Sequence, residues 1–416
     1  MSRRNIVMVT FDSLRADHCG FMGYERNTTP NLDKMAEEGL YFENAIAPGP
    51  GTPVSIFGSF TGELSPVDIK EMRPKPWENA IRRRETIAQL LSEKGYTTGA
   101  FTPNPFASSF FGFDKGFDYF QDFMSDKDGP LDKLYRGILD RFTKTGRTGL
   151  TSIIRGVRNI LKEEEIFKPW EDYYDDILDW IDNADEPFFL WVLLLDTHHP
   201  YLGPPHFQEN ENQLPLYFFS WNGPKNDWKL ELDQDKQKKI LDAYDDSILY
   251  ADEFLGELRS DLAEYDPVFI VHSDHGEGLG DHGFYAHPPS LYEEIIRVPL
   301  VIWNFGLNES KKDPFSTVNL SRFIESIVGN KDNTANGNGL DRKWAISEVL
   351  SEGNRKFGVR LGNWKYIKEK NGEEQLFNLD QDPKERNNVV KEYNNLVEEL
   401  KEIIRLHTRN RELERI

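Results

Sequence analysis

Apolar runs alternate with amphipathic stretches along most of the chain. The apolar runs, rich in β-branched and aromatic residues, predict strands at residues 5–11, 97–102, 188–195, 268–272 and 298–303. The amphipathic stretches predict helices at 31–38, 86–94 and 238–262. This alternation is typical of a mostly parallel sheet covered by helices, so we predict an α/β fold.

The last part of the chain has a different pattern. Short runs at 345–350, 357–361, 364–368 and 375–379 predict antiparallel strands, and 388–406 predicts a helix. We therefore expect a catalytic domain over 1–340 and a small C-terminal α+β subdomain over 341–416. Two stretches rich in charged and aromatic residues, 125–172 and 206–236, break the alternation. We expect them to form insertions near the mouth of a site.

Composition narrows the possible partners. The 416 residues carry a formal charge of −21, which argues against nucleic acid or an anionic membrane as a general partner. A small anionic substrate stays compatible, because a metal ion can reverse the sign of one pocket. The single cysteine, Cys19, excludes an intrachain disulfide framework. The sequence shows neither a signal-peptide pattern nor an apolar run of about 20 residues, so we expect a cytoplasmic protein.

Acidic residues and histidines gather where predicted strands end. Asp12, Asp196 and Asp274 each follow a predicted strand, and seven of the nine histidines lie between His198 and His287. Sites in open α/β sheets form beyond the carboxyl ends of the strands, so we expect the three carboxylates to meet on one rim. Any one of them alone could equally cap a turn or a helix. A mixed carboxylate and imidazole shell suits Zn²⁺ or Mn²⁺.

Four motifs carry a resemblance to a known family. They are the segments 5–17 (NIVMVTFDSLRAD), 28–33 (TTPNLD), 273–283 (SDHGEGLGDHG) and 376–385 (LFNLDQDPKE). Together they resemble the sulfatase family of the alkaline-phosphatase superfamily, and they span nearly the whole chain. The resemblance implies an alkaline-phosphatase-like fold and a metal-dependent ester hydrolase.

The nucleophile position departs from that family. Sulfatases place Cys or Ser there, within a Cys/Ser-x-Pro-Ser-Arg motif, and convert it to formylglycine. Counting back from Thr61 and Gly62 places Thr52 at this position, with Ser55 as the nearest rival. Threonine is not a formylglycine precursor, so we expect no formylglycine. Relatives such as nucleotide pyrophosphatases/phosphodiesterases use a threonine nucleophile, although Thr52 could also be a plain helix cap.

The resemblance also implies a ligand set for one divalent metal ion: Asp12, Thr52, Asp274 and His275. Ser13 stands where Ca²⁺-dependent sulfatases have a second aspartate, so we favour Mn²⁺ or Zn²⁺ over Ca²⁺. The segment 198–201 (HHPY) is similar to the family's His-x-Pro-Tyr element, which makes His198 a ligand for the substrate's anionic oxygens.

His287 stands close to the substrate-binding lysine of sulfatases, and either His198 or His287 could protonate the leaving oxygen. A second metal stays possible, held by Asp196, His198 or His199, and His287.

These observations favour a hydrolase for a small phosphate ester, preferably a diester, that works through a covalent Thr52 intermediate. A sulfuric ester hydrolase, a phosphotransferase that uses the same intermediate, and a non-catalytic anion-binding relative are the alternatives. The sequence does not indicate the substrate or the oligomeric state.

Overall fold

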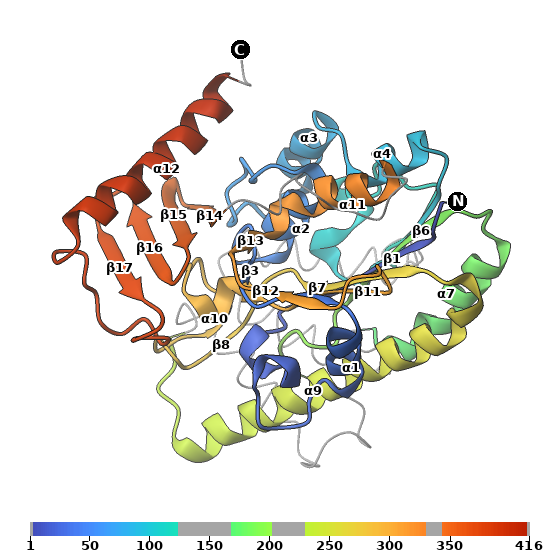
Figure 1. Cartoon of the computed structure of the whole chain (residues 1–416), viewed down its shortest axis with the longest axis horizontal. Helices are drawn as coiled ribbons and strands as arrows, with labels where there is room; N and C mark the ends of the chain where they lie inside the picture. Colours follow the sequence, from blue (N-terminus) through green and yellow to red (C-terminus); the bar gives the residue numbers. More distant parts are fainter. Residues whose placement is uncertain (1–2, 124–167, 202–228, 330–342, 414–416) are drawn as a thin grey trace, which may run out of the picture.

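The computed structural model describes residues 3–123, 168–201, 229–329 and 343–413. Its main body contains an 8-stranded sheet in the order β12-β2-β11-β7-β1-β6-β4-β5 (Figure 1). Five neighbouring strands run parallel: β7 (Val268–Ser273), β1 (Ile6–Phe11), β6 (Phe188–Leu194), β4 (Thr97–Phe101) and β5 (Tyr119–Gln121). The predicted mostly parallel sheet is confirmed.

The other side of the sheet contains its antiparallel strand. β11 (Leu300–Trp303) pairs antiparallel with both β7 and β2 (Leu40–Phe42), and β12 (Glu309–Lys311) runs parallel to β2 at the edge. The sequence did not predict β2, β5 or β12. Each has three residues, which is too few for a pattern of their own, and neighbouring strands fix their register.

Two helical layers cover the sheet because its strands are apolar on both faces. In β1, Val7 and Val9 pack in one core cluster, whereas Ile6 and Met8 pack in another. The first cluster is covered by α1 (Pro30–Glu38), α7 (Glu171–Asn183) and α9 (Gln234–Asp261). The second is covered by α2 (Thr52–Thr61), α3 (Pro74–Arg82), α4 (Ile87–Glu93) and α11 (Leu320–Gly329). In the described part of the chain, no helix is both long and apolar enough to cross a membrane.

The C-terminal strands form a separate antiparallel sheet, as predicted. Its order follows the chain: β14 (Trp344–Ser351), β15 (Asn354–Leu361), β16 (Trp364–Glu369) and β17 (Glu374–Asn378). α12 (Asn394–Leu413) packs across this sheet (Figure 1). The helix begins later than the predicted residue 388. Asn388 Oδ1 accepts the amides of Leu376 and Val390, at 3.0 and 3.1 Å, which ties this residue to β17 in a turn.

Several expected boundaries fall outside the described residues. The proposed domain boundary at 340 lies within 330–342, and most of the two expected insertions lies within 124–167 and 202–228. The described residues of each expected insertion lead into a helix, since α7 begins at Glu171 and α9 at Gln234.

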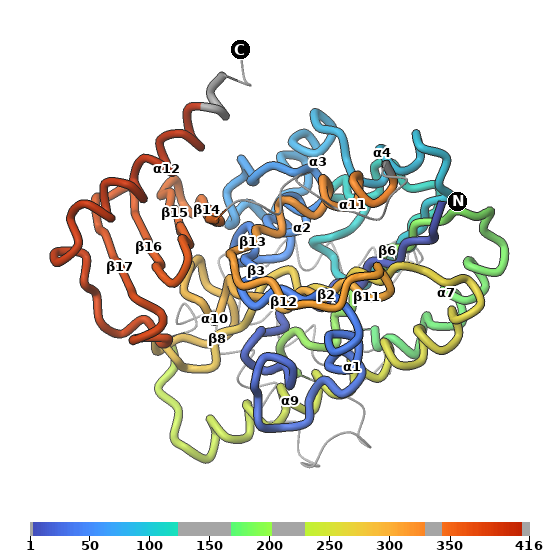
Figure 2. Tube along the Cα trace, viewed as in Figure 1, coloured from blue at the N-terminus to red at the C-terminus, as the bar shows by residue number. Residues whose placement is uncertain are grey.

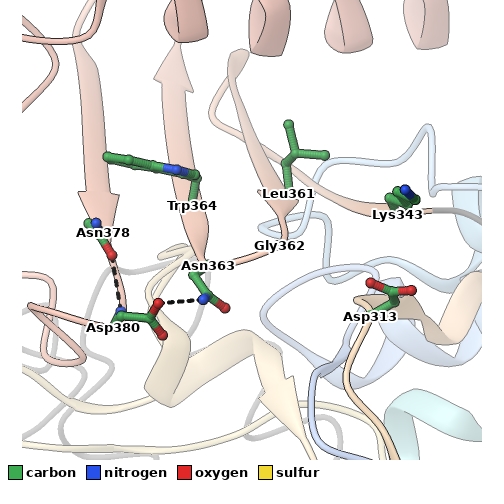
Figure 3. Close-up of a pocket in the computed structure, with 8 residues that line it drawn as sticks. All are labelled: Asp313, Lys343, Leu361, Gly362, Asn363, Trp364, Asn378 and Asp380. Carbon is green, nitrogen blue, oxygen red and sulfur yellow. Dashed lines mark hydrogen bonds between the residues drawn. The ribbon is translucent and has the colours of Figure 1, made fainter.

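The C-terminal sheet meets the main body at α10 (Glu293–Ile296), which Figures 1 and 2 place between the two sheets. A cavity of 320 Å³ lies on another part of this junction. There the β15–β16 turn faces Asp313 and Lys343 (Figure 3). The residues expected to hold a metal do not line this cavity.

Candidate active site

Neighbouring parallel strands deliver the first group of site residues to the carboxyl edge of the main sheet. Asp12 comes directly after β1, and Asp274 and His275 follow β7. The register pairs Phe11 with Ser273, so the two segments leave the sheet side by side. Asp12, Asp274 and His275 are buried, and their ligand atoms all lie within 4.8 Å of one another. The fold thus brings together three residues that the sequence predicted to be metal ligands.

The ring of His275 is oriented for coordination. Its Nδ1–H donates to the carbonyl oxygen of Gly276 at 2.9 Å, and this leaves the lone pair of a neutral ring on Nε2. Nε2 lies 3.7 Å from Asp12 Oδ1 and 3.5 Å from Asp274 Oδ2. Burial, with a further contribution from the nearby His287, lowers the pKa of His275 to about 3. The ring therefore stays neutral, as a metal ligand must be.

The two carboxylates are arranged as partners of a cation. Asp274 Oδ1 accepts the amides of Ser13 and His275 at 3.1 and 2.8 Å, whereas its buried Oδ2 has no hydrogen-bond donor among the described residues. Burial and the charge of Asp12 raise the pKa of Asp274 well above its ordinary value. Two buried carboxylates this close repel each other unless a positive charge lies between them. A divalent ion therefore fits these residues.

Thr52 lies at the start of α2, beside the same atoms. Its Oγ1 is 3.4 Å from both Asp12 Oδ2 and His275 Nε2. The helix begins at Thr52, with Pro53 in its first turn. The rival residue, Ser55, instead donates its hydroxyl to the carbonyl of Gly49 at 2.8 Å. Among the two candidates, Thr52 is the hydroxyl that faces the predicted ligands.

Asn104 is a site residue that the sequence analysis missed. Its Nδ2 donates to Asp12 Oδ2 at 2.5 Å and lies 3.3 Å from Thr52 Oγ1. It follows β4, the next strand but one from β1 in the sheet. An isolated asparagine in a loop carries no spacing or motif that marks it, and only the strand order brings it to the site.

Three histidines form a second group beside the first. The ligand atoms of His198, His199 and His287 lie within 4.8 Å of one another, and the His275 and His287 ring centroids are 4.4 Å apart. His198 donates its Nδ1–H to the carbonyl of His199 at 2.7 Å. The two-residue strands β8 (Gly278–Leu279) and β9 (Tyr285–Ala286) pair antiparallel and bring His287 back to the site.

A buried carboxylate, Glu277, holds this second group. His287 donates Nδ1–H to Glu277 Oε2 at 3.0 Å, Tyr201 donates its hydroxyl to Oε1 at 2.5 Å, and His199 Nδ1 lies 3.6 Å from Oε1. Burial alone would lower the pKa of His287, but the hydrogen bond and charge of Glu277 outweigh it and raise the pKa. Burial and the neighbouring His198 lower the pKa of His199 to about 4. His287 is therefore the better proton donor of these two rings.

Contrary to the prediction, the carboxylate of Asp196 does not lie with those of Asp12 and Asp274. Its Oδ1 accepts the backbone amide of Trp170 at 3.3 Å, next to the start of α7, and it belongs to neither ligand group. Asp12 and Asp274 directly follow the adjacent strands β1 and β7 and do meet at the carboxyl edge. Asp196 lies two residues beyond Leu194, where β6 ends, and its side chain accepts a backbone amide, as in the alternative interpretation of a turn or helix cap.

Comparisons with known proteins agree with this architecture. The sulfatase family model matches residues 4–329. An arylsulfatase of Clostridium perfringens is 27% identical, over 96% of this chain and 93% of that protein. A phosphoethanolamine transferase of Salmonella typhimurium is 23% identical, over 72% of this chain and 46% of that protein. The crystal structure of a phosphonate monoester hydrolase of Agrobacterium radiobacter aligns with a TM-score of 0.68 and 18% identity, over 97% and 96% of the two chains.

The fold is therefore alkaline-phosphatase-like, with a large mixed sheet between helices and a small C-terminal sheet. Within that class, the chain belongs to the sulfatase family and is a sulfatase-family hydrolase.

Proposed function

We propose that this protein is a metal-dependent hydrolase of phosphate esters, preferably diesters, with Thr52 as its nucleophile. The observation that carries the proposal is the position of Thr52 Oγ1, 3.4 Å from both Asp12 and His275 at the start of a helix. Asp12, Thr52, Asp274 and His275 are the proposed ligands of one ion, with Mn²⁺ or Zn²⁺ favoured over Ca²⁺ because imidazole and few carboxylates make up the shell. When bound, such an ion lowers the pKa of the hydroxyl and offsets the charge of the transferred group.

The proposed reaction proceeds in two displacements. Thr52 Oγ1 releases its proton to solvent and attacks phosphorus, and the bond from phosphorus to the leaving oxygen breaks. His287 donates its proton to that oxygen, which departs as an alcohol, while His198 binds a non-bridging oxygen. Water then attacks the phosphorus held on Thr52, and the bond from phosphorus to Thr52 Oγ1 breaks. One proton of the water goes to Thr52 Oγ1 and the other to His287, and a phosphate monoester is released. Asn104 supports the first step because its amide binds Asp12 and faces Thr52.

Charge balance supports a substrate with one negative charge. Asp12 and Asp274 together balance one divalent cation, and Glu277 balances a protonated His287. A phosphodiester carries a single charge, whereas a phosphate monoester carries nearly two at neutral pH. Sulfate esters are also singly charged, so the nucleophile is the feature that favours phosphorus over sulfur. A threonine at the position of the formylglycine precursor argues against the sulfatase reaction.

Replacement of Thr52 tests the mechanism. We expect Thr52→Ala to lower kcat for a p-nitrophenyl phosphodiester by at least about 10³-fold, and Thr52→Ser to retain activity because it keeps the hydroxyl. Mass spectrometry of the acid-quenched wild type should find the phosphoryl group with its retained ester on Thr52, and no aldehyde. Unchanged turnover by Thr52→Ala, or turnover of p-nitrophenyl sulfate alone, would contradict the proposal.

The phosphotransferase alternative is supported by the likeness to a phosphoethanolamine transferase. It shares the first displacement and differs only in the acceptor, an alcohol in place of water. Products formed with and without added alcohols distinguish the two reactions. A non-catalytic anion-binding protein should hydrolyse none of the esters at any metal concentration.

The convergence of His198, His199 and His287 supports a second metal as an alternative to direct substrate binding. Metal analysis of purified protein distinguishes these roles, since two ions per chain that fall to one in His199→Ala would favour the second metal. One ion in both proteins would favour direct binding.

A further inference from the structure

The one-turn helix α10 contacts the proposed metal loop through its backbone. The amide of Gly276 donates to the carbonyl of Ile295 at 2.7 Å, and the amide of Glu277 donates to the carbonyl of Glu294 at 2.9 Å. A Cβ on Gly276 would lie 2.1 Å from the Glu294 carbonyl oxygen, so the two segments touch without room for a side chain. The position of α10 therefore determines where residues 274–277 lie.

The C-terminal subdomain caps the start of the same helix. Glu385, in the loop after β17, accepts the amide of Glu293 on Oε2 at 2.6 Å. Glu293 is the first residue of α10, where amides lack partners inside the helix. Glu385 is only 3% exposed although it follows a surface loop. A buried carboxylate in this position replaces the hydration that the amide would otherwise need.

A buried ionic network fixes the side chain of Glu293 to the C-terminal sheet. Lys365 Nζ, on β16, lies 3.0 Å from Glu293 Oε1 and 3.9 Å from Glu385 Oε1. Arg360 Nε, on β15, lies 3.3 Å from Glu293 Oε2. Lys365 is fully buried, so its charge depends on these carboxylates for stabilisation. Two strands of the C-terminal sheet thus converge on one residue of α10.

A second set of contacts links α10 to Glu385 through His282. The His282 ring stacks on Tyr292 with centroids 3.7 Å apart, and its Nδ1 lies 2.5 Å from Glu294 Oε1. Its Nε2 lies 3.4 Å from the carbonyl of Glu385. His282 therefore serves this junction and not the proposed metal centre, although it lies in the same sequence motif as Asp274.

We propose that Glu385 is a positioning residue of the active site, which acts through α10 to hold the metal loop 274–277 in place. The C-terminal subdomain is then part of the metal centre's supporting structure. The inference rests on the proposed metal centre. A helix of one turn has no stability of its own, so its place is set by what binds its two sides. On one side that is the metal loop, and on the other it is Glu385, Lys365 and Arg360.

The full-length chain allows a direct test with three variants. Glu385→Ala removes the acceptor of the Glu293 amide, whereas Glu385→Gln keeps an oxygen that can accept this amide. Lys401→Met is the matched control, because Lys401 pairs with Glu374 at 3.0 Å and so joins α12 to β17 away from α10. We measure hydrogen exchange of the Gly276 and Glu277 amides in metal-free protein. We also measure Zn²⁺ and Mn²⁺ affinity by competition with a chromophoric chelator.

We expect Glu385→Ala to speed exchange at both amides and to weaken metal affinity about 10- to 100-fold, as loss of a supporting residue does at metal sites. Glu385→Gln should restore most of both properties, and Lys401→Met should match the wild type. Wild-type exchange and affinity in a folded Glu385→Ala would overturn the inference. So would an equal loss in Lys401→Met, because the effect would then belong to subdomain stability.

Two further outcomes are also decisive. If Glu385→Ala does not fold, Lys365→Met takes its place and is judged by the same exchange and affinity criteria, and Glu385→Gln is again expected to stay close to the wild type. If the wild type binds neither metal, the proposed metal centre fails, and exchange at the two amides still decides whether Glu385 positions the loop.

Discussion

Both carboxylate oxygens of Asp12 accept hydrogen bonds from uncharged side chains. Ser13 donates its hydroxyl to Oδ1 at 2.9 Å, and Asn104 donates its amide to Oδ2 at 2.5 Å. Ser13 has a φ of 71°, in the left-handed region that non-glycine residues rarely adopt, and this conformation aims its amide at Asp274. Each carboxylate oxygen has a second lone pair, so these bonds orient Asp12 and still leave it able to bind a cation.

The contribution of Asn104 can be measured separately from that of the metal. We expect Asn104→Ala to lower kcat by about 10²-fold, because a preorganised donor next to the nucleophile is lost. Metal content should stay close to that of the wild type, since all four proposed ligands remain. Steady-state kinetics with metal analysis of the same preparation checks this. An unchanged kcat, or complete loss of metal, would contradict the role given to Asn104.

Gly276 provides a steric test of the same loop. A Cβ there would lie 2.1 Å from the Glu294 carbonyl oxygen, and a backbone atom cannot rotate away. We expect Gly276→Ala to lower the free energy of unfolding by about 1–3 kcal/mol and to weaken metal binding. Urea denaturation and chelator competition measure both. In the control Gly358→Ala, the nearest atoms lie at 3.5 Å in the Leu291 side chain, so little change should be seen.

At the scale of elements, a buried carboxylate on α9 holds the start of α1. Asp252 accepts the amides of Asn31 and Leu32 at 2.7 and 2.9 Å, close to the N-terminus of α1. Burial raises the pKa of Asp252 to about 7, although the two amides act in the opposite direction. The helix is therefore anchored by a group whose charge changes near neutral pH.

This anchor predicts a pH dependence of stability. The folded pKa of Asp252 lies above the unfolded value of about 3.9, so between these values the folded state binds more protons. Its stabilising contribution is complete at low pH and is lost as pH rises towards 7. In urea denaturation from pH 4.5 to 7.5, the stability of wild type relative to Asp252→Asn should fall with pH. A difference that does not vary with pH would exclude the raised pKa.

At the scale of the whole molecule, the chain carries a net charge of −21, yet the substrate that we propose for it is a small anion. The buried acidic pair Asp12 and Asp274 faces a group of imidazoles, and a bound cation makes the local charge favourable. The global charge thus acts on solubility and long-range attraction, whereas nearby groups decide which substrate binds.

Metal removal should therefore destabilise the protein as well as inactivate it. A chelator leaves two buried carboxylates in mutual repulsion, and we expect a lower Tm. Added Zn²⁺ or Mn²⁺ should restore it, with about 2.7 kcal/mol of stabilisation at a free concentration of 100 times Kd, and Ca²⁺ should restore less. Calorimetry with each ion measures this. Asp274→Asn serves as the control and should lose most of the response, whereas a wild type that does not respond to any ion would refute the metal centre.

Much of the fold could be predicted because its long strands are apolar on both faces. β1, β6 and β7 each form a continuous apolar run, and the C-terminal strands are separated by clear turns. The short strands β2 and β12 and the late start of α12 could not be predicted. Their positions depend on neighbouring segments, such as β11 for β2, that lie far away in the sequence.

The candidate site likewise contains residues that the sequence could predict and residues that it could not. Asp12, Thr52, Asp274 and His275 were found from motifs, and the structure brings them together. Asn104 and Glu385 could not be found, since each reaches its partner only through the order of strands and the docking of the C-terminal sheet. Asp196 was expected at the rim but accepts the backbone amide of Trp170. An aspartate after a strand can serve either as a metal ligand or as a cap for backbone amides, and its position in the sequence does not distinguish the two roles.

The sequence by itself determined the residues with the chemistry, their place after apolar strands, and the family to which the chain belongs. It could do so because metal ligands, a nucleophile and turns are recognised from residues that are close together in the sequence. Only the tertiary structure decided which of these groups meet and what holds them there. The register of β1 with β7 places Asp12 beside Asp274, and Glu277 gathers the histidines. These contacts join residues distant in sequence, and the free energy of packing the whole fold selects them.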